Sequence, residues 1–153
     1  MNKTVLITGA TSGIGYATAN VFAEEGCNLI LTGRRAERLK SLKKEIAERC
    51  GVEVAALSFD IRDRYACKAA MESLPEKFRT VDILVNNAGL ASGLEHINEG
   101  DISDWEAMID TNVKGLLYIT RIVSNMMIRQ GGGHIINLGS IAGTQPYENG
   151  SVY

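Results

Sequence analysis

The residues best placed to do chemistry begin with a glycine-rich segment near the start of the chain, Thr8-Gly9-Ala10-Thr11-Ser12-Gly13-Ile14-Gly15. The first glycine allows a tight turn, the second lets backbone approach a pyrophosphate, and the third lets a helix pack closely on the preceding strand. The N-terminus of that helix presents unpaired N–H groups and the positive end of the helix dipole. We predict a dinucleotide-binding loop with contacts from Gly9, Ala10, Thr11, Ser12, Gly13, Ile14 and Gly15. A glycine-rich turn without a ligand is the alternative interpretation.

An arginine pair follows the second expected strand, where the sequence reads Thr32-Gly33-Arg34-Arg35. An NAD-binding unit usually holds an Asp or Glu at this position to bind the ribose hydroxyls. Here no carboxylate repels a 2′-phosphate, and each charge-assisted contact from arginine is worth about 1.5–3 kcal/mol. The pair therefore predicts NADP rather than NAD. Alternatively Arg34 and Arg35 belong to a solvated helix start, although arginine there opposes the helix dipole.

Short apolar runs alternate with longer amphipathic stretches, which is typical of strand–helix–strand units and a parallel sheet. The apolar runs are continuous, as expected for strands that helices cover on both faces. We predict strands at Lys3–Thr8, Asn28–Thr32, Val52–Ser58, Val81–Asn86 and His134–Gly139. We predict helices at Gly13–Glu25, Ala36–Arg49, Arg64–Leu74, Ser103–Ile109 and Val113–Gln130. The predicted fold is α/β, a doubly wound parallel sheet of Rossmann-like type.

Length and composition indicate a single folded domain over residues 1–153, with 45% apolar and 22% charged residues. The formal net charge of −2 excludes the general attraction to nucleic acid or anionic membranes that a basic domain has. No apolar run approaches the roughly 18 residues that span a bilayer, and no signal peptide is apparent. We expect a cytoplasmic protein with a small-molecule partner, no nucleic acid and no membrane. Cys27, Cys50 and Cys67 are far apart, so we expect neither a disulfide framework nor a metal site.

Further motifs follow the glycine loop in an order that resembles the short-chain dehydrogenase/reductase family, from Val5 to Tyr153. They are Asp60 after the third expected strand, Asn86-Asn87-Ala88-Gly89 after the fourth, Asn112 on the long helix, Ser140 after the fifth strand, and Tyr153 thirteen positions later. The resemblance implies that Asp60 and Ile61 hold the adenine and that Asn87, Ala88 and Gly89 line the cofactor groove. It also implies that the catalytic residues are Asn112, Ser140 and Tyr153.

Each of these positions also has a structural interpretation. Asp60 could cap the turn that follows it, and Asn86–Gly89 could be a turn that ends a strand. Asn112 is mildly unfavourable inside a helix, and Ser140 in a glycine-flanked turn is unremarkable alone. The order of the motifs, rather than any one of them, favours function.

By this resemblance the chemistry is reversible hydride transfer between the nicotinamide C4 and a carbinol carbon. Tyr153 would remove or return the hydroxyl proton as a general base or acid. Ser140 would hydrogen-bond the substrate oxygen, and Asn112 would hold a water that links the site to solvent. Gln145 and Tyr147, just before Tyr153, are weaker candidates for substrate contact beside Ser140 and Tyr153 themselves.

Longer stretches are similar to the NADP-dependent 3-hydroxy acid dehydrogenases, namely Thr32–Leu39, Asn86–Gly93, Asp104–Asn112 and Pro146–Tyr153. That subgroup oxidises serine, allo-threonine and related acids, and the resemblance implies a homo-oligomer, a tetramer. Reductases of 3-oxoacyl thioesters share most of these motifs and remain an alternative. A non-catalytic NADP-binding regulatory module is a second alternative, although it has no chemical need for Asn112, Ser140 and Tyr153 together.

The family pairs its tyrosine with a lysine four residues later, whereas this sequence ends at Tyr153. A phenol with an ordinary pKa near 10 is only about one part in a thousand ionised at pH 7, and the lysine lowers that pKa. We therefore expect the 153-residue chain to bind NADP weakly and to turn over slowly. We also expect the C-terminal strands and helices of the fold to be missing, which would leave His134–Gly139 as an exposed apolar edge.

Overall fold

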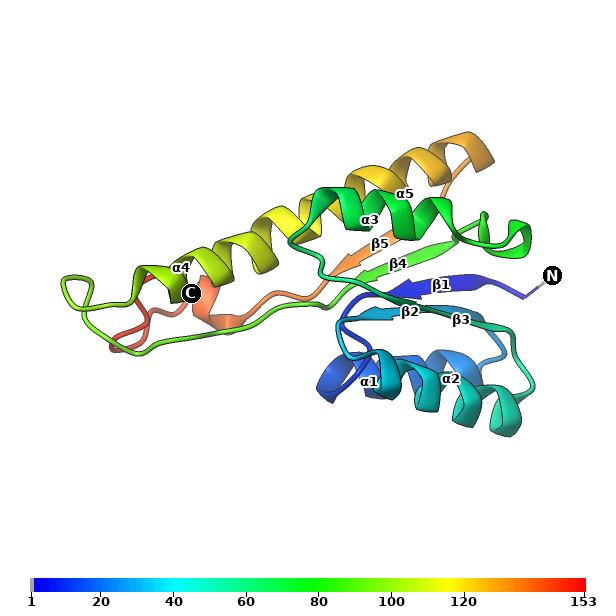
Figure 1. The fold of residues 1–153 in the computed structure, drawn as a ribbon, viewed down its shortest axis with the longest axis horizontal. Coiled ribbons are helices and arrows are strands. Elements are labelled where there is room, and N and C mark those ends of the chain that lie inside the picture. The colour runs from blue at the N-terminus through cyan, green and yellow to red at the C-terminus, as the bar shows by residue number, and fades with distance from the viewer. Residues whose placement is uncertain (1) are drawn as a thin grey trace.

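The computed structural model describes residues 2–153 and shows a five-stranded parallel sheet in the order β3-β2-β1-β4-β5 (Figure 1). All five predicted strands are present, and four are shorter than predicted because their flanking residues form loops. Their bounds are β1 (Thr4–Ile7), β2 (Asn28–Gly33), β3 (Val54–Ser58), β4 (Ile83–Asn86) and β5 (His134–Asn137). The chain crosses from β3 back to β4 beside β1, which is the doubly wound arrangement predicted.

Two helical layers cover the sheet and explain its continuous apolar runs. Helices α1 (Gly13–Glu24) and α2 (Ala36–Cys50) lie on one face, and α3 (Arg64–Glu72) and α5 (Leu116–Gln130) lie on the other (Figure 1). Successive strand residues point to opposite faces. Val5 and Ile7 therefore join the core beneath α1 and α2, while Leu6 joins the core beneath α3 and α5. All three are 0% exposed, so β1 is the buried centre of the fold.

Aspartates fix where two of the helices begin. The Asp63 carboxylate accepts the backbone N–H groups of Tyr65 and Ala66, so α3 starts at Arg64 as predicted. Asp101 accepts the N–H of Ser103 in the same way and starts α4 (Ile102–Met108). These caps satisfy N–H groups that have no partner within the helix.

The predicted break between two helices near residues 110–112 is wrong. Helix α4 continues through a π-helical turn, η2 (Ile109–Gly115), directly into α5. A π-helical turn inserts one extra residue into the hydrogen-bond ladder and keeps the helix continuous. Single turns of 3₁₀-helix also occur at η1 (Glu76–Phe78) and η3 (Ile141–Gly143).

Part of the molecule extends beyond the carboxyl ends of the strands as a projecting arm, residues 87–115 and 138–153 (Figure 1). It carries α4, η2, η3 and the loops that follow β4 and β5. The long helix forms one side of the arm, and the C-terminal segment contacts the loop before α4, where Ser151 Oγ donates to the Glu95 carbonyl at 2.9 Å. The arm therefore adds length to the strand ends where a ligand of a doubly wound sheet would bind.

Strand β5 lies at one edge of the sheet, and Ile135 and Ile136 are only partly buried. Among residues 2–153 only β4 pairs with β5. Within the same residues no helix has the length and apolar character needed to cross a membrane.

Candidate functional site

A cavity of about 1090 Å³ lies at the carboxyl ends of the strands and continues along the projecting arm. The glycine loop, the arginine pair, the segment after β3 and the segment after β4 line one part of it. The π-helical turn and the segment after β5 line the rest. The predicted site residues on its wall are Gly9, Thr11, Ser12, Ile14, Arg34, Arg35, Asp60, Ile61, Asn87, Ala88, Gly89, Asn112, Ser140 and Tyr153.

The glycine loop has the close approaches predicted for it. Gly9 has φ 68°, and a Cβ there would lie 2.9 Å from the Cα of Ala88. A Cβ on Gly15 would overlap the Asn87 amide and the Gly9 carbonyl, so the third glycine lets α1 start against the loop. Gly13 has φ 56° and no neighbouring atom within 4 Å of such a Cβ, which leaves its backbone open.

Three of the predicted cofactor contacts, Ala10, Gly13 and Gly15, do not line the cavity, and their contact with a cofactor stays a prediction. Ala10 and Gly15 are buried. Gly15 shapes the turn, because a Cβ there would meet the Gly9 carbonyl. Ser12, at the N-cap of α1, makes no side-chain cap bond, so the first-turn N–H groups of this helix are available to an anion.

Thr8 joins the glycine loop to the segment after β4. Its Oγ1 accepts the backbone N–H groups of Asn87 and Ala88, each at 3.0 Å, and it is 1% exposed. In return, the Asn87 side chain donates to the carbonyls of Thr8 at 2.8 Å and Gly9 at 3.2 Å. No local pattern predicts this role for Thr8, because its partners lie 79 and 80 positions away along the chain.

The two arginines have different partners. Arg35 is the N-cap residue of α2, and its guanidinium reaches across the glycine loop. Its Nε donates to Thr11 Oγ1 at 3.0 Å and its Nη2 to Ser12 Oγ at 2.7 Å. The Arg34 carbonyl instead accepts from Ser58 Oγ at 3.3 Å, on the β3 side. Both arginines line the cavity, so the pair places positive charge at one end of it.

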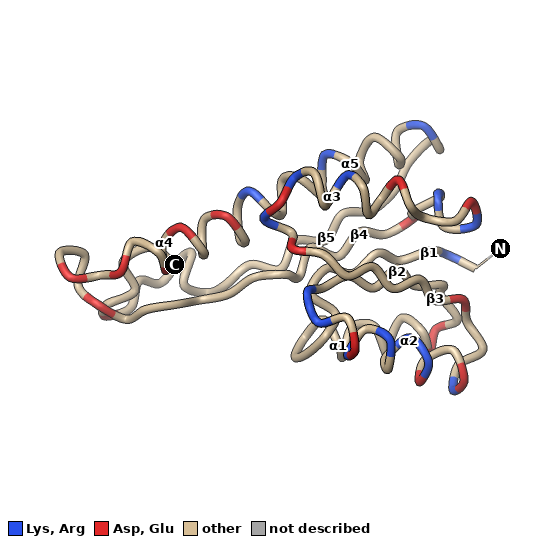
Figure 2. The backbone as a smooth tube through the Cα atoms, in the orientation of Figure 1, with Lys and Arg blue, Asp and Glu red and all other residues tan. Residues whose placement is uncertain are grey.

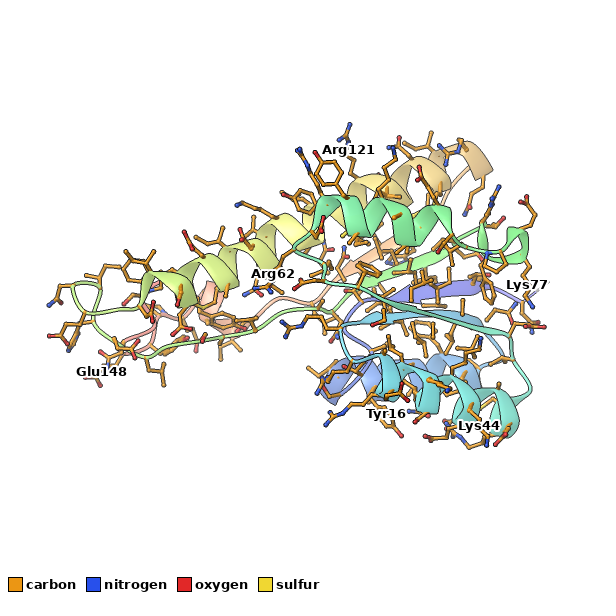
Figure 3. All side chains as sticks on the ribbon, viewed as in Figure 1. Tyr16, Lys44, Arg62, Lys77, Arg121 and Glu148 are labelled. Atoms are coloured by element: carbon orange, nitrogen blue, oxygen red, sulfur yellow. The ribbon has the colours of Figure 1, made fainter. Side chains whose placement is uncertain are left out.

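Asp60 is bound by Arg62, a residue that the sequence analysis did not single out. The guanidinium donates to the Asp60 carboxylate at 2.6 Å, and the Arg62 backbone N–H does so at 3.0 Å. Hydrogen bonds from the Arg62 side chain lower the pKa of Asp60, burial opposes this, and the charge of Arg34 adds to the lowering. The turn-capping interpretation of Asp60 is therefore confirmed, and Asp60 also faces the cavity with Ile61. Figure 3 shows Arg62 where the arm leaves the sheet.

Asn112 clamps the π-helical turn to the segment after β4. Its Oδ1 accepts the Leu90 N–H at 2.9 Å, and its Nδ2 donates to the Leu90 carbonyl at 2.8 Å. A Cβ on Gly89 would lie 3.3 Å from the same Oδ1, so this glycine permits the contact. The side chain thus positions backbone, and its expected role in holding water stays a prediction.

Ser140 and Tyr153 line the cavity from the segment after β5, which lies three strands from β2 and the arginines that follow it. The Ser140 Oγ accepts the Ala142 N–H at 3.2 Å and caps η3, which leaves its own proton free to donate. Tyr153 is 41% exposed. Gln145 and Tyr147 do not line the cavity, and Tyr147 packs against Gly150 instead, so their expected substrate contact has no support here.

Charge is distributed unevenly along this cavity. Among the described residues on its wall, Arg34 and Arg35 are the only cationic side chains and Asp60 is the only acidic one, and all three follow β2 or β3. The projecting arm carries seven acidic residues and one Lys or Arg, Lys114, and the acidic surplus is visible in Figure 2. Lys114 itself pairs with Asp110 at 2.7 Å. A ligand with a phosphate at one end therefore binds most favourably with that phosphate beside Arg34 and Arg35.

Comparisons with known proteins agree with this geometry. The chain is 51% identical over 149 residues to "NADP-dependent 3-hydroxy acid dehydrogenase YdfG" of Salmonella typhimurium, which covers 97% of this chain and 58% of that relative. It is 50% identical to "Sulfoacetaldehyde reductase 2" of Chromohalobacter salexigens, over 100% of this chain and 60% of the relative. The structure matches the closed form of serine dehydrogenase complexed with NADP+ with a TM-score of 0.90 and 48% identity, over 98% of this chain and 59% of that one.

The chain thus spans about three-fifths of the length of these relatives. A family model described as short chain dehydrogenase matches residues 3–153. The resemblance inferred from the order of the motifs is confirmed, and the chain belongs to the short chain dehydrogenase family.

Proposed function

We propose that this chain carries the cofactor-binding half and three catalytic positions of an NADP-dependent oxidoreductase that interconverts a CH–OH group and a carbonyl. The observation that carries the proposal is one cavity that is lined both by Arg34 and Arg35, after β2, and by Ser140 and Tyr153, which follow β5. The relatives named above as NADP-dependent or complexed with NADP+ support the same assignment.

The residues present fit this cofactor. The open backbone at Gly13 and the uncapped start of α1 suit a pyrophosphate, and Arg35 keeps three of its five guanidinium N–H groups for a 2′-phosphate. Asp60 and Ile61 would hold the adenine, and Asn87, Ala88 and Gly89 would line the central groove. When bound, NADP supplies or accepts the hydride.

The chain's own residues would handle the proton and the developing charge. Tyr153 would take the proton from the substrate hydroxyl in oxidation and return it to the carbonyl oxygen in reduction. Ser140 would donate its free proton to that oxygen and stabilise negative charge there. Asn112 would act by holding the Leu90 backbone, and therefore the wall of the cavity, in place.

We infer that the substrate is a small 3-hydroxy acid, such as serine from the relatives' names or allo-threonine from the family resemblance. The residues that line the described cavity offer no cation to a substrate carboxylate beside Ser140 or Tyr153. The cavity wall therefore supports the reaction type more strongly than it supports an acidic substrate.

A homo-oligomer is supported by the outer face of the long helix. Leu117 and Ile128 lie about three turns apart on α5, are 57% and 74% exposed, and do not line the cavity. Residues at this spacing share one face of a helix, and an exposed apolar stripe of this kind favours burial against another subunit. We propose that this face contributes to a tetramer, which light scattering would test.

The proposed cofactor is tested by titrating the chain with NADPH and NADH, followed by nicotinamide fluorescence. We expect tighter binding of NADPH, and a loss of about tenfold or more in NADPH affinity alone when Arg35 becomes Met, since one charge-assisted phosphate contact is removed. Equal affinities for the two nucleotides would refute the assignment.

The proposed reaction is tested with NADPH labelled by deuterium at C4 and a 3-oxo acid, because mass spectrometry detects even slow transfer of the label. We expect transfer with the unaltered chain and none with Tyr153→Phe. Transfer only to a 3-oxoacyl thioester would refute the substrate assignment. Binding of NADPH without transfer to either substrate would refute the assignment as an enzyme in favour of a binding module.

A further inference from the structure

The side chain of Thr11 is fixed from two sides. On one side lies Gly33, at the end of β2, where a Cβ would come within 2.9 Å of the Thr11 methyl group. The absence of a side chain at Gly33 thus lets this methyl pack directly on the strand. On the other side the Thr11 hydroxyl oxygen accepts the Arg35 Nε–H at 3.0 Å. A threonine with its methyl held in this way has one preferred direction for its hydroxyl.

The Arg35 guanidinium is held at two points without any ligand. Thr11 fixes its Nε, and Ser12 accepts from its Nη2 at 2.7 Å. A long, exposed arginine otherwise loses about 2 kcal/mol of rotamer entropy when it is fixed on a phosphate. Because the Thr11 and Ser12 hydroxyls already restrict the Arg35 side chain, part of this entropy is lost on folding rather than on binding. The remaining guanidinium N–H groups are left for a ligand.

Arg34 has no such restraint among the side-chain hydrogen bonds of the described residues. It is held through its backbone carbonyl by Ser58. The two arginines are therefore unequal, although the sequence makes them neighbours. Arg35 is the preorganised member of the pair, and Thr11 is the residue that links its orientation to the glycine loop.

We propose that Thr11 is a positioning residue for cofactor selectivity, which sets the preference for NADP over NAD by holding Arg35 for the 2′-phosphate. The proposal rests on the proposed function of this site. Thr11 then acts through its hydroxyl on a group 24 positions away, in addition to any backbone contact that it makes within the loop. Ser12 supports the same group from its other end.

The test compares Thr11→Val, which keeps the methyl contact and removes the acceptor, with Thr11→Ser, which keeps the acceptor. Dissociation constants for NADPH and NADH are measured for each variant by nicotinamide fluorescence. We expect Thr11→Val to weaken NADPH about tenfold, as for the loss of one hydrogen bond to a charged group, and to leave NADH within twofold. Thr11→Ser should restore most of the preference, and Ser12→Ala should lower it as well.

The same substitution is then made in an Arg35→Met background. Because Thr11 acts through Arg35, we expect Thr11→Val to cause no further loss of NADPH affinity there. A parallel loss of NADPH and NADH, or an unchanged ratio between them, would overturn the positioning role while the proposed function stands. Failure of the unaltered chain to bind either nucleotide would overturn the proposed function and this inference with it.

Discussion

Replacing Thr8 with Val should destabilise the fold more than any other change of one hydroxyl to a methyl at the sheet. The Thr8 hydroxyl is the acceptor for two backbone N–H groups, of Asn87 and Ala88, and both distances are 3.0 Å. Valine has nearly the same shape, so no cavity opens, but both donors lose their partner. A buried donor left without an acceptor costs about 1–3 kcal/mol.

The size of the effect follows from burial. Thr8 is 1% exposed, while Asn87 and Ala88 are half-buried, so water can replace part of what is lost. We therefore expect the free energy of unfolding to fall by about 2–4 kcal/mol, from the lower part of the range for each of two donors. The carbonyl of Val85 keeps a partner, because it also accepts the Thr8 N–H at 3.0 Å.

Urea unfolding followed by circular dichroism measures this change, and the m-value should stay the same because the surface exposed on unfolding is the same. Thr4→Val is the matched control. Thr4 begins β1, the strand that ends just before Thr8, and is 5% exposed; among the described residues its only hydrogen bond to a side chain runs from its backbone N–H to Asp82. We expect the control to change stability by less than about 0.5 kcal/mol. Equal losses of unfolding free energy in the two variants would refute the stabilising role of the two hydrogen bonds that the Thr8 hydroxyl accepts.

Two further predictions concern the glycine loop and Asp60. Gly15→Ala places a methyl group against Asn87 and the Gly9 carbonyl and should cost about 1–3 kcal/mol of unfolding free energy, whereas Gly143→Ala, with open space around it, should cost little. The pKa of Asp60 is lowered in the folded state, so its stabilising effect is complete above the unfolded pKa and is lost as the pH falls through the folded pKa. Asp60→Asn should therefore be less stable than the parent by at most about 1 kcal/mol at pH 7, and the difference should shrink on acidification below 3.8. Urea unfolding at neutral pH measures the Gly15→Ala effect, and urea unfolding at neutral and acid pH measures the Asp60→Asn effect. A stability difference between Asp60→Asn and the parent that does not change with pH would contradict the Asp60 prediction.

The elements that local sequence determines were predicted well. The run Val5-Leu6-Ile7 indicates a strand with helices on both faces, and all three residues are fully buried. The start of α3 at Arg64 was also predicted, and the structure shows Asp63 as its cap. In both cases the signal lies within a few residues of the feature, because side-chain periodicity and helix capping are local effects.

The missed helical continuity has a tertiary cause. Asp110, Thr111 and Asn112 are poor helix formers, so the sequence predicts a break there. In the structure, the Asn112 amide makes two hydrogen bonds to Leu90, which lies 22 positions earlier. These bonds offset the low helix propensity and hold the backbone in a π-helical turn. No local pattern reports a partner at that separation.

The inequality of the arginine pair has the same origin. From sequence, Arg34 and Arg35 are two equivalent cations after a strand. Only the fold shows that Gly33 makes room for Thr11, and that Thr11 in turn holds one of the two arginines. The sequence predicts that two arginines lie at the 2′-phosphate position, but it does not predict which of them is held by Thr11.

The same feature recurs at each wall of the cavity: a segment that faces the ligand position is tied by a polar side chain from elsewhere in the chain. Thr8 ties the segments after β1 and β4, Arg35 ties those after β2 and β1, and Asn112 ties the π-helical turn to the segment after β4. Loops that are ordered before a ligand arrives spare the binding step the entropic cost of ordering them. Folding must bear that cost instead. Substitutions at these positions should therefore lower the stability of the free protein as well as its affinity for nucleotide, whereas a residue that only touches the ligand should lower affinity alone.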